Sequence, residues 1–327
     1  AGQPGGVAVS TLREAEYFVD NGILDIQYAV GIVPDRLERV AALLKRGASI
    51  QLITDNPWVA SAVGEKGREL GVEFKVLIEI DTGEERSGVF PNSPHMIEIA
   101  KIINGNEGSV LEGVMTHAGH SYKCTTIAEI VKVAEAERDG VVEAARILRD
   151  GGMKCPVVSV GSTPTALYAE NLEGVTEARA GVYMFGDMFQ AQINSCSVDD
   201  LAVSVLSQVT GHRSEYNRLL IDAGALALSK DRSTENVAND VGFGMVADIS
   251  SSPFVPQLNI SRVYQEHGQV EGSGGVPLES MPIGSRVRVL PNHVCMTSAM
   301  YCKYYVIDSD SKDDQEVVAE WSRINGW

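Results

Sequence analysis

Residues 49–80 read SIQLITDNPWVASAVGEKGRELGVEFKVLIEI, and this stretch decides the fold. Two short runs rich in β-branched residues, SIQLIT and FKVLIEI, flank a longer amphipathic segment. A strand, a helix and a second strand in this order are typical of a βαβ unit, in which the strands are parallel and the crossover is right-handed. The stretch therefore predicts an α/β domain.

The same alternation continues on both sides of this unit. Helical segments separate the strands, for example from Thr11 to Gly22 and from Ile127 to Gly152. The predicted strands are VAVS (7–10), LDIQYAV (24–30), SIQLIT (49–54), FKVLIEI (74–80), LEGVMTH (111–117), PVVSVG (156–161) and TEARAGVYM (176–184).

Seven alternating strands are one fewer than a (β/α)8 barrel needs to close. An open doubly wound sheet would normally carry a glycine-rich fingerprint after its first strand, and the sequence has none there. We therefore expect a TIM-like (β/α)8 barrel whose first strand and helix belong ahead of Ala1.

Beyond about residue 198 the pattern changes to alternating strands separated by Gly, Pro, Ser and Asp. This change predicts two domains, a barrel over residues 1–197 and a mainly antiparallel β-domain over 198–327. The acidic run DSDSKDDQE (308–316) is interpreted as a solvated loop. The predicted strands are LAVSVLSQVTGHR (201–213), YNRLLIDAG (216–224), LNISRVYQEHGQV (258–270), GSRVRVLPNH (284–293) and YYVID (304–308).

The composition of the 327 residues limits the classes of function. A hydrophobic fraction of 44% argues against disorder, and no apolar run is long enough to cross a bilayer. Because 27 basic residues face 44 acidic ones, the net charge of -17 would repel nucleic acid and anionic lipid. The start, AGQPGGVAVS, does not resemble a signal peptide, and five dispersed cysteines favour a reducing, cytoplasmic compartment: Cys124, Cys155, Cys196, Cys295 and Cys302.

The last two strand ends of a barrel commonly bind phosphate. Here the last two predicted barrel strands end in Gly161-Ser162-Thr163 and in Ala180-Gly181-Val182-Tyr183. Glycines let backbone N–H groups approach an anion, and the hydroxyl groups of Ser162, Thr163 and Tyr183 add donors. We predict a phosphate cup from these two turns; the alternative is two ordinary tight turns.

Two other strand ends carry chemically useful side chains. The loop DTGEERSG (81–88) delivers Arg86, whose permanent charge suits an oxyanion or phenolate, although a surface salt bridge to a neighbouring glutamate is an equal alternative. The strand LEGVMTH ends in His117, and His120 and Tyr122 follow within six residues. Two imidazoles and a phenol at one strand end favour a place in the site.

A pair of metal-ligand types lies in PNHVCMT (291–297). His293 and Cys295 are two residues apart, so both would point to the same face of an extended backbone. Imidazole with thiolate favours zinc, and two protein ligands would leave positions for water or substrate. The alternative is a buried cysteine beside a hydrogen-bonded histidine.

Together these segments resemble the D-serine dehydratase and D-threonine aldolase family, whose members are pyridoxal-phosphate enzymes of the alanine racemase fold. The resemblance extends from residue 1 to the final Gly-Trp. It implies a barrel of the alanine racemase type, a β-domain, a homodimer, pyridoxal 5'-phosphate and a divalent metal, zinc or manganese. The segments are TLREAEYF (11–18), IDTGEERSGV (80–89), THAGHSY (116–122), VGSTPT (160–165), EARAGVYMFGD (177–187), LLIDAGALALSKD (219–231), YQEHG (264–268) and PNHVCMT (291–297).

The resemblance also assigns roles to single residues. Arg86 would address the phenolic oxygen of the cofactor and His117 would lie against its ring, with Tyr122 in the catalytic group. Arg179 falls where alanine racemase places an arginine on the pyridine nitrogen, a position at which dehydratases and aldolases vary. The phosphate would be held by Gly161, Ser162, Thr163, Gly181 and Val182 with Tyr183 close by, and the metal by His293 and Cys295.

One expected residue is missing. The family binds its cofactor as a Schiff base to the lysine of a Pro-His-x-Lys-Thr-His-like motif, and no such motif occurs in this sequence. Lys75, Lys123 and Lys230 are not credible substitutes, because they fall at the wrong strand end, on a distant loop and in the β-domain. We expect this lysine in the upstream segment that the barrel needs; a naturally shortened, inactive relative is the alternative.

The resemblance implies a lyase that acts on D-β-hydroxy-amino acids with pyridoxal phosphate and a metal. Many D-threonine aldolases carry an aspartate where this chain has Cys295, which favours dehydration of D-serine or D-3-hydroxyaspartate. Retro-aldol cleavage of D-threonine to glycine and an aldehyde is the first alternative. An amino-acid racemase and a non-catalytic cofactor-binding protein are the others.

Overall fold

The computed structural model describes residues 5–249, 258–308 and 315–326. The chain divides into two compact units: unit 1 comprises residues 1–124, 128–180 and 326–327, and unit 2 comprises residues 125–127 and 181–325. The predicted domain boundary at residues 197 and 198 therefore falls inside unit 2.

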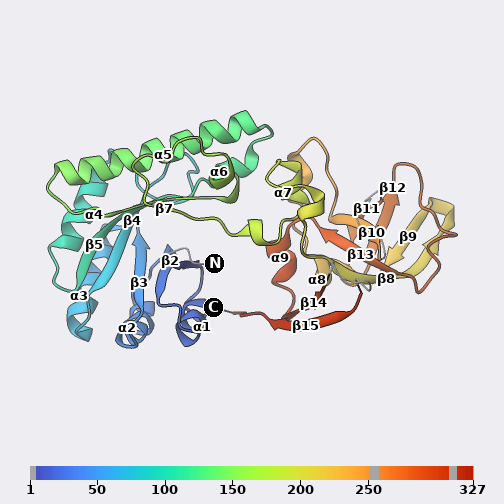
Figure 1. Ribbon diagram of the computed structural model, residues 1–327, viewed down its shortest axis with the longest axis horizontal. Coiled ribbons are helices and arrows are strands. Elements are labelled where there is room, and N and C mark those ends of the chain that lie inside the picture. Colours follow the sequence, from blue (N-terminus) through green and yellow to red (C-terminus); the bar gives the residue numbers. More distant parts are fainter. Residues whose placement is uncertain (1–4, 250–257, 309–314, 327) are drawn as a thin grey trace. The chain divides into compact units, whose positions relative to one another are not determined.

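Unit 1 contains one parallel sheet of seven strands in sequence order, and Figure 1 shows its crossover helices packed around the sheet. The strands are β1 (Val7–Val9), β2 (Asp25–Gly31), β3 (Ser49–Thr54), β4 (Phe74–Glu79), β5 (Ser109–Met115), β6 (Val157–Val160) and β7 (Glu177–Ala178). The helices are α1 (Leu12–Asp20), α2 (Leu37–Lys45), α3 (Pro57–Leu70), α4 (Pro94–Asn104), α5 (Ile127–Asp150) and α6 (Thr163–Tyr168). The predicted alternation of strands and helices is confirmed.

Local sequence explains where these elements begin and why they pack. Thr11 caps α1, and its side chain and that of Glu14 form a reciprocal capping box. Apolar residues of successive strands, such as Ile26, Ile50 and Val76, are fully buried beneath the helices. The core of unit 1 thus lies between the sheet and its crossover helices.

The strand predicted over 176–184 is wrong beyond β7. Only Glu177 and Ala178 pair with β6, because β6 ends at Val160 and the chain turns at Gly161. Among the described residues no further strand pairs with β7, and the chain enters a 3-10 helix at Val182–Met184.

Unit 2 is built around a closed barrel of antiparallel strands, which confirms the predicted β-domain. The strand order is β10-β11-β12-β9-β8-β13, and β14 and β15 form a separate two-stranded sheet (Figure 1). The strands are β8 (Val205–Arg213), β9 (Arg218–Ile221), β10 (Gly244–Asp248), β11 (Leu258–Val263), β12 (Gly268–Gly272), β13 (Arg286–Pro291), β14 (Lys303–Ile307) and β15 (Val317–Ser322). The short helix α7 (Met188–Gln192) precedes β8, α8 (Ala225–Leu228) follows β9, and α9 (Val294–Ser298) follows β13.

Some strand predictions in unit 2 need correction. The run predicted as one strand over 258–270 is a hairpin, which turns where the Tyr264 amide donates to the His267 carbonyl at 2.8 Å. Strands β10 and β15 were not predicted, because their short runs lack a clear alternation. The solvated-loop prediction for residues 308–316 falls largely on 309–314, outside the described residues.

Candidate functional site

The carboxyl ends of β4, β5, β6 and β7 gather one group of predicted site residues in unit 1. Parallel strands end at the same edge of a sheet, so loops distant in sequence meet there. The Thr82 and Thr116 hydroxyl oxygens are 2.9 Å apart, and the Glu84 carboxylate packs against Gly119. The loop that carries Arg86 therefore contacts the loop that follows His117.

The turn after β6 requires a glycine. Gly161 has φ +145°, and a Cβ there would lie 2.0 Å from the carbonyl oxygen of Arg179. Ser162 then caps α6 in a reciprocal capping box with Thr165, and its hydroxyl is 2.9 Å from that of Ser121. The backbone of this turn is thus held closely against β7.

Thr163 supplies the observation that points to a ligand at this turn. Its hydroxyl oxygen is buried and, among the described residues, has no hydrogen-bond partner. A buried hydroxyl without a partner is costly, so such groups in native proteins generally meet water or a ligand. A phosphate oxygen is a suitable acceptor, and the turn at 161–163 fits the predicted phosphate group.

His117 is held against the same turn. Its Nδ1 lies 2.7 Å from the carbonyl oxygen of Gly161, so Nδ1 carries the proton and donates. Burial lowers the pKa of His117, and the positive charges of Arg86 and Arg179 lower it further, against the opposing effects of Gly161 and Glu84. The ring is therefore neutral at neutral pH. Its centroid is 6.4 Å from that of Tyr122.

Arg179 is mostly buried, with 12% of its side chain exposed, and its guanidinium contacts two strand ends. Its guanidinium donates to the Ser159 hydroxyl and to the Thr116 carbonyl, and it lies 3.9 Å from a Glu177 carboxylate oxygen. Burial lowers the pKa of Arg179, while the acids around it, Glu177 first, raise it. The assignment of Arg179 to the pyridine nitrogen remains a prediction.

Arg86 forms the ion pair that the sequence left open as an alternative. Its guanidinium is 3.3 Å from the Glu84 carboxylate, and its side chain is 56% exposed. The loop is shaped by Asp81, whose carboxylate accepts the amides of Gly83 and Glu85 at 2.9 and 3.2 Å. The role of Arg86 at the phenolic oxygen remains a prediction.

The other half of the predicted phosphate cup belongs to unit 2. Gly181 precedes the 3-10 helix that contains Val182 and Tyr183, and the Tyr183 side chain is 64% exposed. The participation of these residues in phosphate binding remains a prediction from sequence.

The predicted metal ligands lie at the start of α9 in unit 2. His293 is the N-cap residue and Cys295 is in the first helical turn, so the extended backbone expected for this pair is wrong. Pro291, which has no amide hydrogen, ends β13, and the chain turns into the helix directly afterwards. The two side chains are nevertheless close enough for Cys295 to raise the pKa of His293.

Asp231 orients the imidazole of His293. Its carboxylate accepts a hydrogen bond from His293 Nδ1, and the Ser233 hydroxyl lies 3.3 Å from the same nitrogen. Burial lowers the pKa of His293, but the interactions with Cys295 and Asp231 outweigh burial and raise the pKa to about 9. A carboxylate on one ring nitrogen is the usual support of a metal-binding histidine, because it directs the other nitrogen toward the metal.

This donor set suits a metal that accepts nitrogen and sulfur. Imidazole and thiolate are ligands of zinc rather than of magnesium or calcium. Within residues 5–249, 258–308 and 315–326, no group of three or more His, Cys, Asp or Glu is arranged to hold a metal ion. The fit therefore rests on the two predicted ligands and on Asp231 behind them.

Three acids important to these sites were missed from the sequence. Asp231 is 62 residues from His293, and no spacing links them. Asp187 is fully buried and accepts the amide of Val294, next to His293, at 2.9 Å. Glu137 lies within α5 among buried apolar residues, and this break in an apolar stripe was a readable signal.

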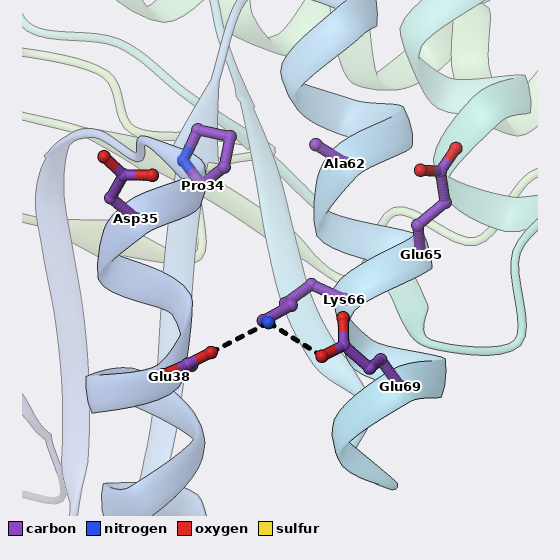
Figure 2. Close-up of a pocket in the computed structure, with 7 residues that line it drawn as sticks. All are labelled: Pro34, Asp35, Glu38, Ala62, Glu65, Lys66 and Glu69. Carbon is purple, nitrogen blue, oxygen red and sulfur yellow. Dashed lines mark hydrogen bonds and ion pairs between the residues drawn. The ribbon is translucent and has the colours of Figure 1, made fainter.

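A hollow on the outer surface of unit 1 is separate from these groups. It has a volume of about 470 Å³ and lies between α2 and α3 (Figure 2). Lys66 pairs there with Glu38 and Glu69 at 2.8 and 2.9 Å, and Asp35 and Glu65 add further negative charge. An acidic surface with its lysine already paired does not suit a phosphate group.

Comparisons with known proteins agree with this architecture. Residues 1–188 match the family model described as alanine racemase, N-terminal domain, and residues 202–307 match a serine dehydratase domain. The chain is 42% identical to D-threo-3-hydroxyaspartate dehydratase of Delftia sp. (strain HT23), over 98% of this chain and 84% of that enzyme. It is 32% identical to D-serine dehydratase of Dictyostelium discoideum, over 94% of this chain and 80% of that enzyme.

The solved structure of the Delftia enzyme superimposes with a TM-score of 0.94 and covers 100% of this chain and 86% of its own. Structures of D-threo-3-hydroxyaspartate dehydratase, 42% identical to this chain, include a His→Ala variant and a Cys→Ala variant in a metal-free form, and the two replaced residues are two positions apart. No helix in the described residues has the length and hydrophobicity to span a membrane. The chain belongs to the family of D-serine dehydratases and D-threonine aldolases, pyridoxal-phosphate-dependent lyases built on the alanine racemase fold.

Proposed function

We propose that this protein is a dehydratase that converts D-3-hydroxyaspartate or D-serine into a 2-oxo acid and ammonia. The identity of 42% to a D-threo-3-hydroxyaspartate dehydratase, over nearly the whole chain, supports this reaction. The observation that carries the proposal is the His293–Cys295 pair. It has the same residue types and the same spacing as the two residues replaced in the variants of that enzyme.

Unit 1 contributes several of the residues proposed to hold pyridoxal phosphate. The cofactor supplies an electron sink for charge that develops at the substrate Cα. Thr163 is proposed to donate its unpartnered hydroxyl to the phosphate group, and Gly161 allows the turn that places it. His117 presents a neutral ring, because its Nδ1 proton is donated to Gly161 and burial lowers its pKa.

Unit 2 contributes the proposed metal site, and zinc is the proposed metal. His293 and Cys295 would be its ligands, while Asp231 holds the proton of His293 Nδ1 and so sets the orientation of the ring. A divalent metal supplies Lewis-acid assistance to the departure of a β-hydroxyl group. Manganese is the alternative, which a stoichiometric metal analysis of the purified protein distinguishes.

The reaction is tested with the product of the complete reading frame that contains residues 1–327. Pyridoxal phosphate and zinc are added to it, with D-threo-3-hydroxyaspartate, D-serine, D-threonine and their L-enantiomers as separate substrates. We expect 2-oxo acid and ammonia in equal amounts from the first two D-amino acids. Chelation of the metal should abolish their formation.

The same assay separates the alternatives. If glycine and an aldehyde are the only products, the reaction is retro-aldol cleavage and not dehydration. Interconversion of enantiomers that is insensitive to chelator would indicate a racemase. Cofactor binding without turnover of any substrate would indicate a non-catalytic binding protein.

We also propose a cytoplasmic homodimer. None of the five cysteines forms a disulfide, which fits a reducing compartment. Light scattering at several concentrations tests the dimer, and a fluorescent fusion observed in the native host tests the location.

A further inference from the structure

We propose that Glu137 is a positioning residue, which holds the turn at Gly161 and the backbone beside His117 so that both can meet the cofactor. The proposal rests on the function proposed above, since it concerns the same cofactor site. It assigns a role to a side chain on a helix that contributes no other predicted site residue.

Glu137 is buried where the helix pattern calls for an apolar residue. The inner face of α5 buries apolar side chains at helical spacing, and Glu137 sits among them with 2% of its surface exposed. A buried carboxylate costs several kcal/mol unless hydrogen bonds compensate it. The apolar neighbours are Ile130, Ala134, Val141, Ala144, Ala145 and Leu148.

The partners of Glu137 are donors from two strand-end loops. Its Oε1 accepts the amide of Gly161 at 2.8 Å, and the Thr165 hydroxyl and the Ala118 amide lie near enough to the carboxylate to lower its pKa. Burial raises the pKa of Glu137, while these three donors and the charge of Arg179 lower it. Because all three partners donate, they match the ionised carboxylate.

Two of these partners adjoin His117, one next to it in the chain and one in contact with its ring. Ala118 follows His117 directly in the chain, and Gly161 provides the carbonyl oxygen that accepts the His117 Nδ1 proton. One carboxylate thus fixes the backbone that carries the imidazole and the peptide that the imidazole contacts. Thr165 extends the same control to the cap formed by Ser162.

The test compares Glu137→Gln with Glu135→Gln, an exposed acid on the same helix. Glutamine keeps the size of the side chain but brings an amide NH₂ toward groups that donate, so at least one hydrogen bond is lost. Histidine-selective ¹⁵N spectra report the tautomer of His117, assigned with a His117→Asn variant. Calorimetry reports the affinity for pyridoxal 5'-phosphate, and for pyridoxal as the probe without phosphate.

In the unchanged protein and in Glu135→Gln, we expect His117 to show only the Nδ1–H tautomer. In Glu137→Gln, we expect a mixture of tautomers and an affinity for pyridoxal 5'-phosphate lower by about tenfold, the equivalent of one lost hydrogen bond. A lower melting temperature with both readouts unchanged would reduce Glu137 to a structural role and overturn the proposal.

Two further outcomes keep the inference separate from the proposed function. If the protein does not bind pyridoxal 5'-phosphate but the His117 tautomer still depends on Glu137, the function fails and the positioning role stands. If Glu137→Gln does not fold, the Gly161 amide of the unchanged protein is observed instead. A downfield, slowly exchanging amide proton supports the bond to the carboxylate, and a fast-exchanging one contradicts the proposal.

Discussion

The turn after β6 in unit 1 and the turn after β13 in unit 2 are built in opposite ways. Both lead from a strand into a short helix, and each has a backbone amide held by a buried carboxylate, Glu137 or Asp187. The first turn depends on the shape of the backbone, because Gly161 packs against β7 without room for a Cβ. The second depends on the chemistry of its side chains, since His293 and Cys295 are its only predicted ligands.

This difference teaches that the two sites should fail through different substitutions. A site made from backbone geometry is sensitive to added volume. A site made from donor atoms is sensitive to the loss of one atom.

The largest effect is expected in unit 2. His293→Ala and Cys295→Ala should each lower the metal affinity by about 1000-fold, because each removes one of very few ligands from a site whose binding energy they share. Metal content after dialysis measures the loss. His95→Ala and Cys302→Ala, at exposed positions, are the controls. If either ligand variant retains the metal, the metal site lies elsewhere in the protein.

The next largest effect is expected from Gly161→Ala, which should destabilise the fold. Steric overlap with the Arg179 carbonyl and an unfavourable φ should together lower the free energy of unfolding by about 3 kcal/mol. Gly152→Ala is the matched control: Gly152 also has a positive φ, +79°, but a Cβ added there would meet nothing within 4 Å. Its cost should be about 1 kcal/mol. Equal costs in urea unfolding would mean that the close approach to β7 is unimportant.

Asp231→Asn should have a smaller effect on the metal than loss of a ligand. The amide keeps the volume but weakens the orientation of His293, so we expect the metal affinity to fall by about 10- to 100-fold. Competition with a chelating dye measures this change. Asp199→Asn, a substitution of an exposed aspartate in the same unit, should leave the affinity unchanged. If Asp231→Asn behaves like this control, Asp231 does not support the metal ligand.

The smallest effects are expected at two neighbouring threonines, which should differ in whether they affect phosphate affinity or stability. Thr163→Val removes a hydroxyl that has no partner among the described residues, so stability should stay the same or rise slightly while phosphate affinity falls about fivefold. Thr165→Val removes a hydroxyl that is bonded to Ser162 and should lower the free energy of unfolding by about 1 kcal/mol. Thermal unfolding and phosphate calorimetry of both variants test this contrast. Loss of stability in Thr163→Val would show that its hydroxyl serves the fold.

The local patterns predicted most of the elements but fewer of their contacts. The helical segments predicted over residues 11–22 and 127–152 correspond to α1 and α5, because hydrogen bonds and packing within a helix join residues three and four apart. The sequence did not predict where β7 ends, because the length of a strand depends on a neighbouring strand that the local sequence does not contain. The hairpin at residues 258–272 was missed for a related reason: its turn interrupts what reads as one alternating run.

The sequence alone determined the chemistry available to this protein: the order of parallel strands, the glycine and hydroxyl groups at their ends, and the imidazole and thiol of His293 and Cys295. Only the tertiary structure decided which groups from distant parts of the chain contact these residues. Asp231 reaches His293 across 62 positions, and Glu137 reaches both Ala118 and Gly161. The physical reason is that a buried carboxylate must find its donors in three dimensions, and these come from loops that no spacing in the chain connects.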